Sequence, residues 1–116
     1  MFASNFCVKA SDTKHVRGRG KLTKFAQSKT IESGNTMENH FCSVCGTLMY
    51  RISSGWPELL ITRIGTVDDY DLHETVLKPR NEIYAKNRVC WLGGVDGAKE
   101  HKDGGPYASD KKASAL

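Results

Sequence analysis

The sequence predicts a mainly β fold, built of antiparallel sheets with about five or six short strands. Stretches rich in Val, Ile, Thr, Leu and aromatic residues are separated by turn-forming Gly, Asn, Ser and Pro along most of the chain. The strongest strand candidate is 58–67 (ELLITRIGTV). A pair of cysteines lies between two further β-prone stretches, which favours a hairpin at that point.

The N-terminal third predicts two strands joined by a polar loop. Residues 2–8 are rich in aromatic and apolar residues and alternate weakly, which indicates a strand. Residues 11–20 are polar and end in the turn-forming sequence RGRG. Residues 21–27 (KLTKFAQ) predict a second short strand, and residues 28–35 predict a loop that ends in a Gly-Asn turn.

The middle of the chain predicts three strands in succession. Residues 36–42 and 47–53 are β-prone and are expected to pair as a hairpin around the cysteines. The 58–67 strand follows, and Gly65 within it predicts a bulge. Together with the preceding strands, this order predicts an all-β meander.

The C-terminal part predicts less regular structure. Residues 68–75 indicate a turn with one short helical stretch, which Asp68 or Asp69 can cap. Residues 81–86 predict a final short strand, and an apolar patch surrounds Trp91. From Gly93 onward the sequence is polar without periodicity. We therefore expect one domain followed by a disordered tail, with the bounds 1–95 and 96–116.

The composition is that of one soluble domain. The chain has 116 residues, of which 39% are hydrophobic and 26% charged. No apolar run approaches the roughly 20 residues that a membrane span needs, so no membrane partner is expected. The N-terminus lacks the pattern of a signal peptide. A cytoplasmic location is expected, with the nucleus as the alternative.

The net charge is +4, and seven basic residues lie close together near the N-terminus with a single acid, Asp12, among them. Such a stretch can attract phosphate or another anion. A solvated, charged face is favoured instead, because no aromatic stacking pattern accompanies the charges. Nucleic acid is therefore not an expected partner. The basic residues are Lys9, Lys14, Arg17, Arg19, Lys21, Lys24 and Lys29.

The most informative motif is a C-x-x-C-G sequence formed by Cys42, Cys45 and Gly46. This spacing lets two thiolates reach one Zn²⁺ at about 2.3 Å each. The glycine permits a tight turn in which backbone amides face the sulfurs. With a strand on each side, the motif predicts a zinc knuckle at a hairpin tip. Zn²⁺ is thus the expected cofactor, with Cys42 and Cys45 as its ligands.

A tetrahedral zinc site needs four ligands, so two remain to be found. No remaining cysteine or histidine forms a second close pair in the sequence. The two other cysteines are expected to be core residues, His40 to be a surface or packing residue, and His101 to be exposed in the tail. Alternatively, two copies of the chain that share one zinc would form a homodimer. Within one chain, the candidates for the two missing ligands are Cys7, Cys90, His15, His40, His73 and His101.

The sequence is less consistent with two other uses of the cysteines. Four cysteines would suit two disulfides in a secreted protein, but reduced thiols or metal ligands are favoured without an export signal. A thioredoxin-like redox site needs its first cysteine at the start of a helix. Strands flank this motif, so the redox interpretation is disfavoured.

Residues 2–94 resemble about the C-terminal two-thirds to three-quarters of the glutathione-dependent formaldehyde-activating enzyme and centromere protein V family. The resemblance is specific because several motifs occur in the same order and at fitting distances. They are SGNT at 33–36, HFCSVCGTLMYR at 40–51, GTVDD at 65–69, KP at 78–79 and VCWL at 89–92.

This resemblance implies antiparallel sheets held by zinc, described as a β-tent. It also implies making or breaking a carbon–sulfur bond on a glutathione adduct such as S-hydroxymethylglutathione, so a small thiol adduct is the expected substrate. In the family, Cys42 and Cys45 would belong to a structural zinc site, and its partners come from an N-terminal C-x-C-G segment. A C-x-C-x-x-C segment holds a second, catalytic zinc.

Neither of those N-terminal segments occurs in this sequence. The chain is therefore expected to be an N-terminally truncated member, and no catalytic residue is assigned. A family enzyme, a carbon–sulfur lyase, is one hypothesis. The alternative is a non-catalytic remnant that serves as a structural or binding module for polyanions.

Overall fold

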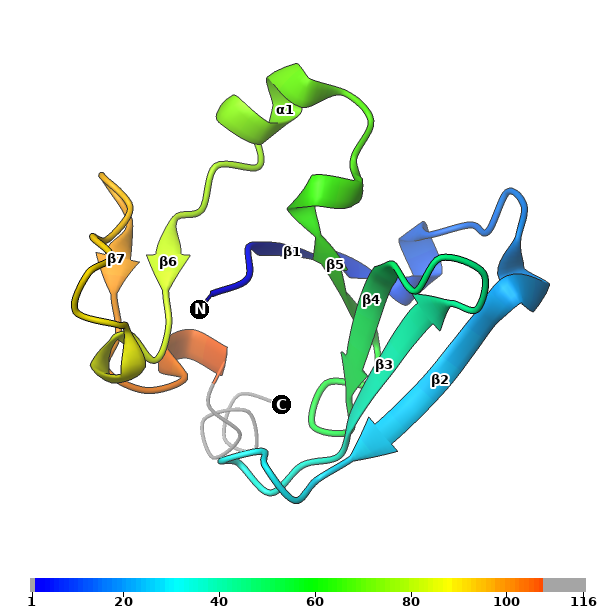
Figure 1. Ribbon diagram of the computed structural model, residues 1–116, viewed down its shortest axis with the longest axis horizontal. Helices are drawn as coiled ribbons and strands as arrows, with labels where there is room; N and C mark the ends of the chain where they lie inside the picture. The colour runs from blue at the N-terminus through cyan, green and yellow to red at the C-terminus, as the bar shows by residue number, and fades with distance from the viewer. Residues whose placement is uncertain (1, 108–116) are drawn as a thin grey trace.

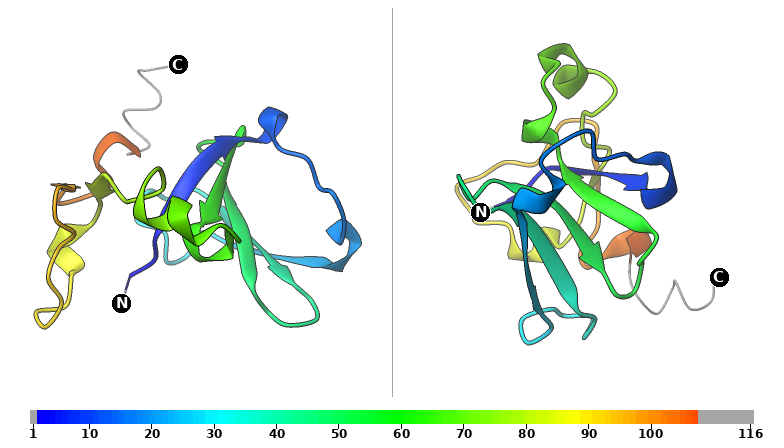
Figure 2. Two further views of the ribbon diagram at one scale, coloured as in Figure 1. Left: turned by 90° about the horizontal axis from the view of Figure 1, so that it is seen from above. Right: turned by 90° about the vertical axis from the view of Figure 1, so that its right-hand side faces the viewer.

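The computed structural model describes residues 2–107, and it confirms the mainly β class. Five strands form one antiparallel sheet in the order β1-β5-β4-β3-β2, and two short strands pair in parallel beside it (Figures 1 and 2). The strands are β1 (Asn5–Lys9), β2 (Leu22–Gln27), β3 (Met37–Cys42), β4 (Leu48–Ser53), β5 (Leu59–Arg63), β6 (Asn81–Glu82) and β7 (Lys99–Glu100).

The predicted hairpin is present as β3 and β4. Their register pairs Asn39 with Arg51 and His40 with Tyr50. An irregularity between His40 and Phe41 shifts the register just before the turn. Across this shift β3 advances by one residue and β4 by two, so the extra residue is Met49 of β4. No sequence pattern predicts a bulge there.

The bulge predicted at Gly65 is wrong. Gly65 lies instead in a 3₁₀ turn, Ile64–Thr66, which ends β5 earlier than predicted. The hydroxyl of Thr66 donates to the carbonyl of Arg63 at 2.8 Å. The amide of Val67 donates to the carbonyl of Ile64 at 3.1 Å. These bonds satisfy the backbone within the turn, so the chain leaves the sheet.

The predicted meander holds for β2 to β5, but β1 departs from it. The first strand pairs with β5, in a register that joins Cys7 to Ile61. It therefore lies at the edge opposite β2. This pairing joins residues far apart in the sequence, which local patterns do not encode.

Side chains alternate between the two faces of the sheet, and the register defines one row on each face. The first row runs across the sheet through Phe6, Thr62, Tyr50, His40 and Lys24. The second runs through Cys7, Ile61, Arg51, Asn39 and Phe25. We call these the tyrosine face and the arginine face.

Burial is concentrated near β5. Leu60 and Ile64 are the buried apolar residues among those described, and the polar Ser53 is buried as well. Most other strand residues are half-buried. Large apolar side chains such as Phe25, at 57% exposure, remain accessible. The sheet thus has a narrow core under its centre and accessible surfaces on either side.

The short helix predicted over 68–75 is present as α1 (Tyr70–Glu74). The carboxylate of Asp69 accepts a hydrogen bond from the amide of Asp71 at 3.1 Å, so Asp69 is the N-cap. Within residues 2–107, no helix has the length and apolar composition that crossing a membrane requires.

The predictions for the C-terminal region need correction. The strand predicted over 81–86 is only the two-residue β6, because Tyr84 adopts a positive φ of 54° and a 3₁₀ turn follows. Part of the predicted tail, 96–116, contains β7, which pairs with β6. Ion pairs bring these charged segments together. Hydrophobic periodicity in the sequence does not predict ion pairs, so the pairing of the two strands was not expected. Residues 108–116 of that tail lie outside the described residues.

Two arginine-carboxylate contacts and two lysine-carboxylate contacts stabilise this region. The Nη1 of Arg88 lies 2.7 Å from Glu82 and 3.0 Å from Glu100, so it joins β6 to β7. The Nζ of Lys86 lies 2.6 Å from Asp103 and 3.0 Å from Glu32. The second of these contacts ties the region to the loop before β3. The boundary at residue 95 stays a prediction.

Candidate metal site at the β3–β4 turn

The two predicted ligands lie on the tight turn that joins β3 to β4 (Figure 1). The amide of Cys42 donates to the carbonyl of Thr47 at 2.9 Å, and the amide of Gly46 donates to the carbonyl of Cys42 at 2.8 Å. Gly46 has a φ of +80°, in the left-handed region that glycine adopts without steric cost. The turn therefore depends on a glycine directly after the second cysteine.

Both sulfurs accept or share hydrogen bonds within this turn. The amide of Val44 donates to the Sγ of Cys42 at 3.4 Å. The Sγ of Cys45 lies 3.2 Å from the Oγ1 of Thr47. The first of these contacts is of the amide-to-sulfur kind that the motif predicted. It places the partial positive charge of an amide beside the sulfur of Cys42.

Cys45 is exposed, and its pKa is lowered from the ordinary value. The largest cause is the side-chain hydrogen bond with Thr47, followed by the backbone of Thr47 and by the Cys42 thiol. A thiol with a lowered pKa is more often a thiolate, which is the form that binds metal. Cys42, at the end of β3, is half-buried.

The pair has the donor chemistry of two zinc ligands. Its sulfurs lie on one turn, and one of them has a lowered pKa. Within residues 2–107, no group of three or more His, Cys, Asp and Glu side chains is placed to hold a metal ion. The described residues therefore supply two ligands of such a site, and zinc stays a prediction.

The two remaining cysteines are exposed, so the core roles predicted for them are wrong. Cys7 lies on β1, an edge strand, and partial covering of its thiol still raises its pKa by desolvation. Cys90 precedes Trp91, whose side chain is 72% exposed. In the apolar patch predicted there, Trp91 is exposed, whereas Val89 and Leu92 are half-buried.

The histidines have partners other than the two thiols. The ring of His40 stacks on Tyr50 with centroids 4.8 Å apart, and its Nε2 lies 3.2 Å from Glu38, which confirms a packing role. The Nε2 of His15 lies 3.0 Å from the hydroxyl of Tyr50.

The other two histidines bind parts of the chain after β5. The Nε2 of His73 lies 2.8 Å from the carbonyl of Val67. The Nε2 of His101 lies 2.9 Å from the Oδ1 of Asn81, and His101 is half-buried. The exposure predicted for His101 is therefore wrong, because the segment that carries it packs against β6.

The structural context does not match a thioredoxin-like site. Cys45 is followed by β4, and the first cysteine ends a strand. A redox-active C-x-x-C motif has its first cysteine at a helix N-terminus, which helps to lower its pKa. The arrangement is that of a hairpin tip, as predicted.

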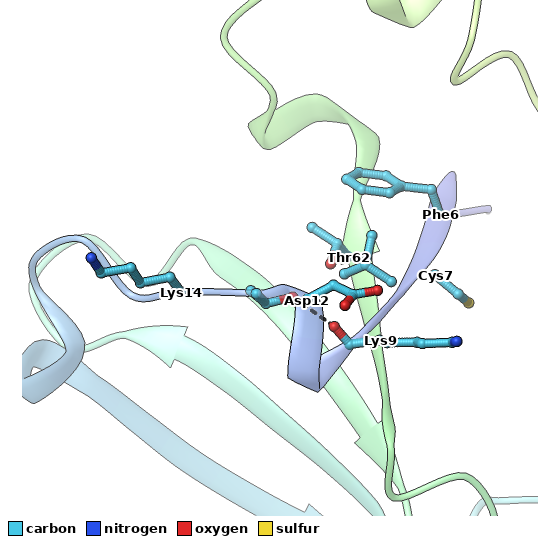
Figure 3. A pocket seen from close by; sticks show the side chains of 8 residues that line it. Phe6, Cys7, Lys9, Asp12, Lys14 and Thr62 are labelled. Carbon is cyan, nitrogen blue, oxygen red and sulfur yellow. Dashed lines mark hydrogen bonds between the residues drawn. The ribbon is translucent and has the colours of Figure 1, made fainter.

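An open pocket lies beside β1 and was not indicated by the sequence (Figure 3). Phe6 and Thr62 lie next to each other there, with Asp12 close by, whereas the side chains of Cys7 and Lys9 point the other way. The hydroxyl of Thr13 donates to the carbonyl of Lys9 at 2.9 Å, which holds the segment after β1. The pocket contains no pair of thiols and so does not extend the metal site.

The sequence also gave no indication of two arginines on the arginine face. The Nε of Arg51 donates to the Oδ1 of Asn39 at 2.8 Å. The Nη1 of Arg63 donates to the Oδ1 of Asn5 at 2.9 Å. Burial lowers the pKa of Arg51, and the charge of Arg63 lowers it further. The two guanidinium groups are therefore close enough to repel, a relation that only the strand register creates.

Three comparisons with known proteins bear on this site. A family model described as glutathione-dependent formaldehyde-activating enzyme matches residues 1–87, which include all five strands of the large sheet and the β3–β4 turn. Neither the search of curated proteins nor the search of solved structures found a match.

Proposed function

We propose, because the chain belongs to the glutathione-dependent formaldehyde-activating enzyme family, that it binds Zn²⁺ and acts on a carbon–sulfur bond of a glutathione adduct. The family points to a glutathione-related function. The observation that carries the proposal is the pair of thiols on the β3–β4 turn, inside the residues that match the family. S-hydroxymethylglutathione is the proposed adduct.

The zinc half of the proposal places Cys42 and Cys45 as two ligands. Bound there, zinc would crosslink the turn and stabilise the hairpin, and structural zinc sites contribute on the order of 10 kcal/mol in small domains. A tetrahedral ion needs two further ligands. A second copy of the chain that contributes its own two cysteines would supply them, and the protein would then be a homodimer.

The reaction proposed is the addition of the glutathione thiol to formaldehyde, and its reverse. In the forward direction a bond forms between sulfur and the carbonyl carbon, while the proton of the thiol moves to the carbonyl oxygen. The reverse step breaks the same bond and returns the proton to sulfur. No oxidant or reductant is needed. The residues that move the proton are not assigned.

The test measures exchange between free formaldehyde and S-hydroxymethylglutathione by NMR, with zinc-loaded protein. We expect an exchange rate above the uncatalysed rate that rises in proportion to protein concentration. The Cys42→Ser/Cys45→Ser double variant should lose this increase. Cys90→Ser is the matched control, because that cysteine is exposed and lies outside the turn. An exchange rate equal to the uncatalysed rate at full zinc occupancy would exclude the proposed activity.

One observation favours the non-catalytic alternative, a binding module for polyanions. The basic segment before β2 is exposed, with Arg17 and Arg19 both accessible. Exposed cations of this kind bind polyanions in a manner that salt weakens. If the exchange assay shows no activity and the chain binds heparin at low salt but not at high salt, this second function replaces the first.

A further inference from the structure

Two arginines lie close together on the arginine face, on neighbouring strands at the centre of the sheet. Arg51 is on β4 and pairs with Ile61 of β5, and Arg63 is two residues further along β5. Residues two apart on a strand point to the same face, so the two side chains are diagonal neighbours. Both residues are half-buried.

Each arginine is oriented by a neutral side chain. Arg51 uses its Nε to reach Asn39, which leaves its two terminal nitrogens for another partner. Arg63 uses Nη1 to reach Asn5. An amide oxygen accepts a hydrogen bond but brings no negative charge. The asparagines thus hold the guanidinium groups in place without neutralising them.

No carboxylate faces this pair from the sheet. The five strands contain a single acidic residue, Glu38, and the register places it on the tyrosine face with His40. The cation of β1 on the arginine face is Lys9, which adds positive charge. Among residues 2–107, the ion pairs that form do not include Arg51 or Arg63.

This arrangement has an electrostatic cost that a bound anion would remove. Like charges at neighbouring positions of a sheet repel, and partial burial strengthens the repulsion. Guanidinium groups form paired hydrogen bonds with carboxylates, and such charged pairs are stronger than neutral hydrogen bonds. Two oriented guanidinium groups without an acidic partner have the chemistry of a carboxylate site.

We propose that Arg51 and Arg63 bind a carboxylate of the glutathione adduct, a negatively charged small peptide. The identity of this ligand rests on the proposed function, whereas the anion site itself rests on the geometry of the arginine face. Glutathione has a carboxylate at each end, so it can engage both guanidinium groups. The two asparagines, Asn5 and Asn39, act as positioning residues.

The experiment uses ophthalmic acid, an analogue of glutathione with both carboxylates and no thiol. Its binding to the full chain is measured by titration calorimetry. We expect saturable binding that Arg51→Gln and Arg63→Gln each weaken by about tenfold or more, because each variant loses charge-assisted hydrogen bonds to the ligand. Arg80→Gln removes the same charge from an exposed position outside the large sheet and should leave the affinity within about twofold.

Two ligand controls identify what is bound. The diamide of ophthalmic acid lacks both carboxylates and should bind weakly, with the same affinity for the wild type and the arginine variants. Inorganic phosphate should displace ophthalmic acid only at higher concentration. Displacement by phosphate at equal or lower concentration would contradict a carboxylate peptide as the ligand.

The proposal would be overturned if the wild type failed to bind ophthalmic acid, or if Arg51→Gln, Arg63→Gln and Arg80→Gln all bound it equally. Thermal unfolding shows whether each variant is folded. If Arg51→Gln does not fold, Arg63→Gln decides the question, because within residues 2–107 the Arg63 side chain is hydrogen-bonded to the exposed Asn5 alone. Ophthalmic acid has no thiol to react, so binding and the exchange activity can fail independently.

Discussion

The β3–β4 turn and the arginine face differ in the chemistry of their side chains and are built in different ways. The turn presents two thiols. Most of the bonds that shape it lie within residues 42–47, and one more joins the amide of Ser43 to the carbonyl of Lys21. The arginine face presents two cations, and it depends on side chains from β1, β3, β4 and β5. The turn should therefore depend less on the register of the sheet than the arginine face does.

The comparison also shows what each region lacks. Two thiols on one turn can bind a metal cation, and two guanidinium groups without a carboxylate partner among residues 2–107 can bind an anion. A zinc ion and a charged glutathione adduct would satisfy these two requirements. The predictions that follow test whether the two regions respond separately, and they run from the largest expected effect to the smallest.

Removal of zinc should have the largest effect, and it should act through the turn. If Cys42 and Cys45 bind a structural zinc, a chelator should lower the melting temperature by more than about 10 °C, since such ions contribute several kcal/mol in small domains. Calorimetry with and without chelator measures the change. A melting temperature that the chelator leaves unchanged would contradict a structural role for zinc.

Truncation of the core should affect the arginine face more than the turn. Leu60 is 6% exposed and lies on β5, the strand that carries Arg63 and separates β4 from β1. Leu60→Ala should lower the free energy of unfolding by about 2–5 kcal/mol, because it leaves a cavity under the strand that carries Arg63. Urea titration measures this loss, and Val16→Ala, at a side chain that is 86% exposed, is the control with little effect.

A change at Gly46 should affect the turn alone. The φ of +80° disfavours any side chain, although a β-carbon there would meet no atom within 4 Å. Gly46→Ala should therefore lower the free energy of unfolding by about 1 kcal/mol through backbone strain alone. It should weaken zinc binding and leave ophthalmic acid binding unchanged. Equal loss of both ligands would show that the two regions are coupled.

The smallest effect is expected at Thr47, whose hydrogen bonds lower the pKa of Cys45. Thr47→Val removes the side-chain bond, so the pKa of Cys45 should rise and its alkylation by iodoacetamide at neutral pH should slow. Because the folded pKa is lowered, the thiolate contributes stability at high pH that is lost as the pH falls through that pKa. The pH dependence of alkylation in metal-free protein measures the shift, and an unchanged profile would exclude the role given to Thr47.

The parts of the structure that depend on neighbouring residues could be predicted from the sequence. The hairpin, the glycine turn after Cys45 and the cap of α1 each involve residues within a few positions of one another. The pairing of β1 with β5 and of β6 with β7 joins distant segments, so local patterns missed both. The same reason explains why the arginine pair was not foreseen.

Burial was also difficult to predict from residue type. Cys7 and Cys90 have the chemistry of core residues, yet both are exposed. The single narrow core around Leu60 and Ile64 does not extend to the edge strand or to the segment near Trp91. Which face of a strand is covered depends on the segments that pack on it, and this information is not contained in the strand itself.

The most direct test of the account is the zinc content of the purified protein, measured together with its mass in solution. We expect bound zinc at about one ion per chain, or about half an ion per chain in a dimer that shares it. Cys42→Ser should abolish this zinc, and Cys90→Ser should retain it. Absence of zinc from the wild type, or an unchanged zinc content in Cys42→Ser, would contradict the assignment of the β3–β4 turn as a metal site.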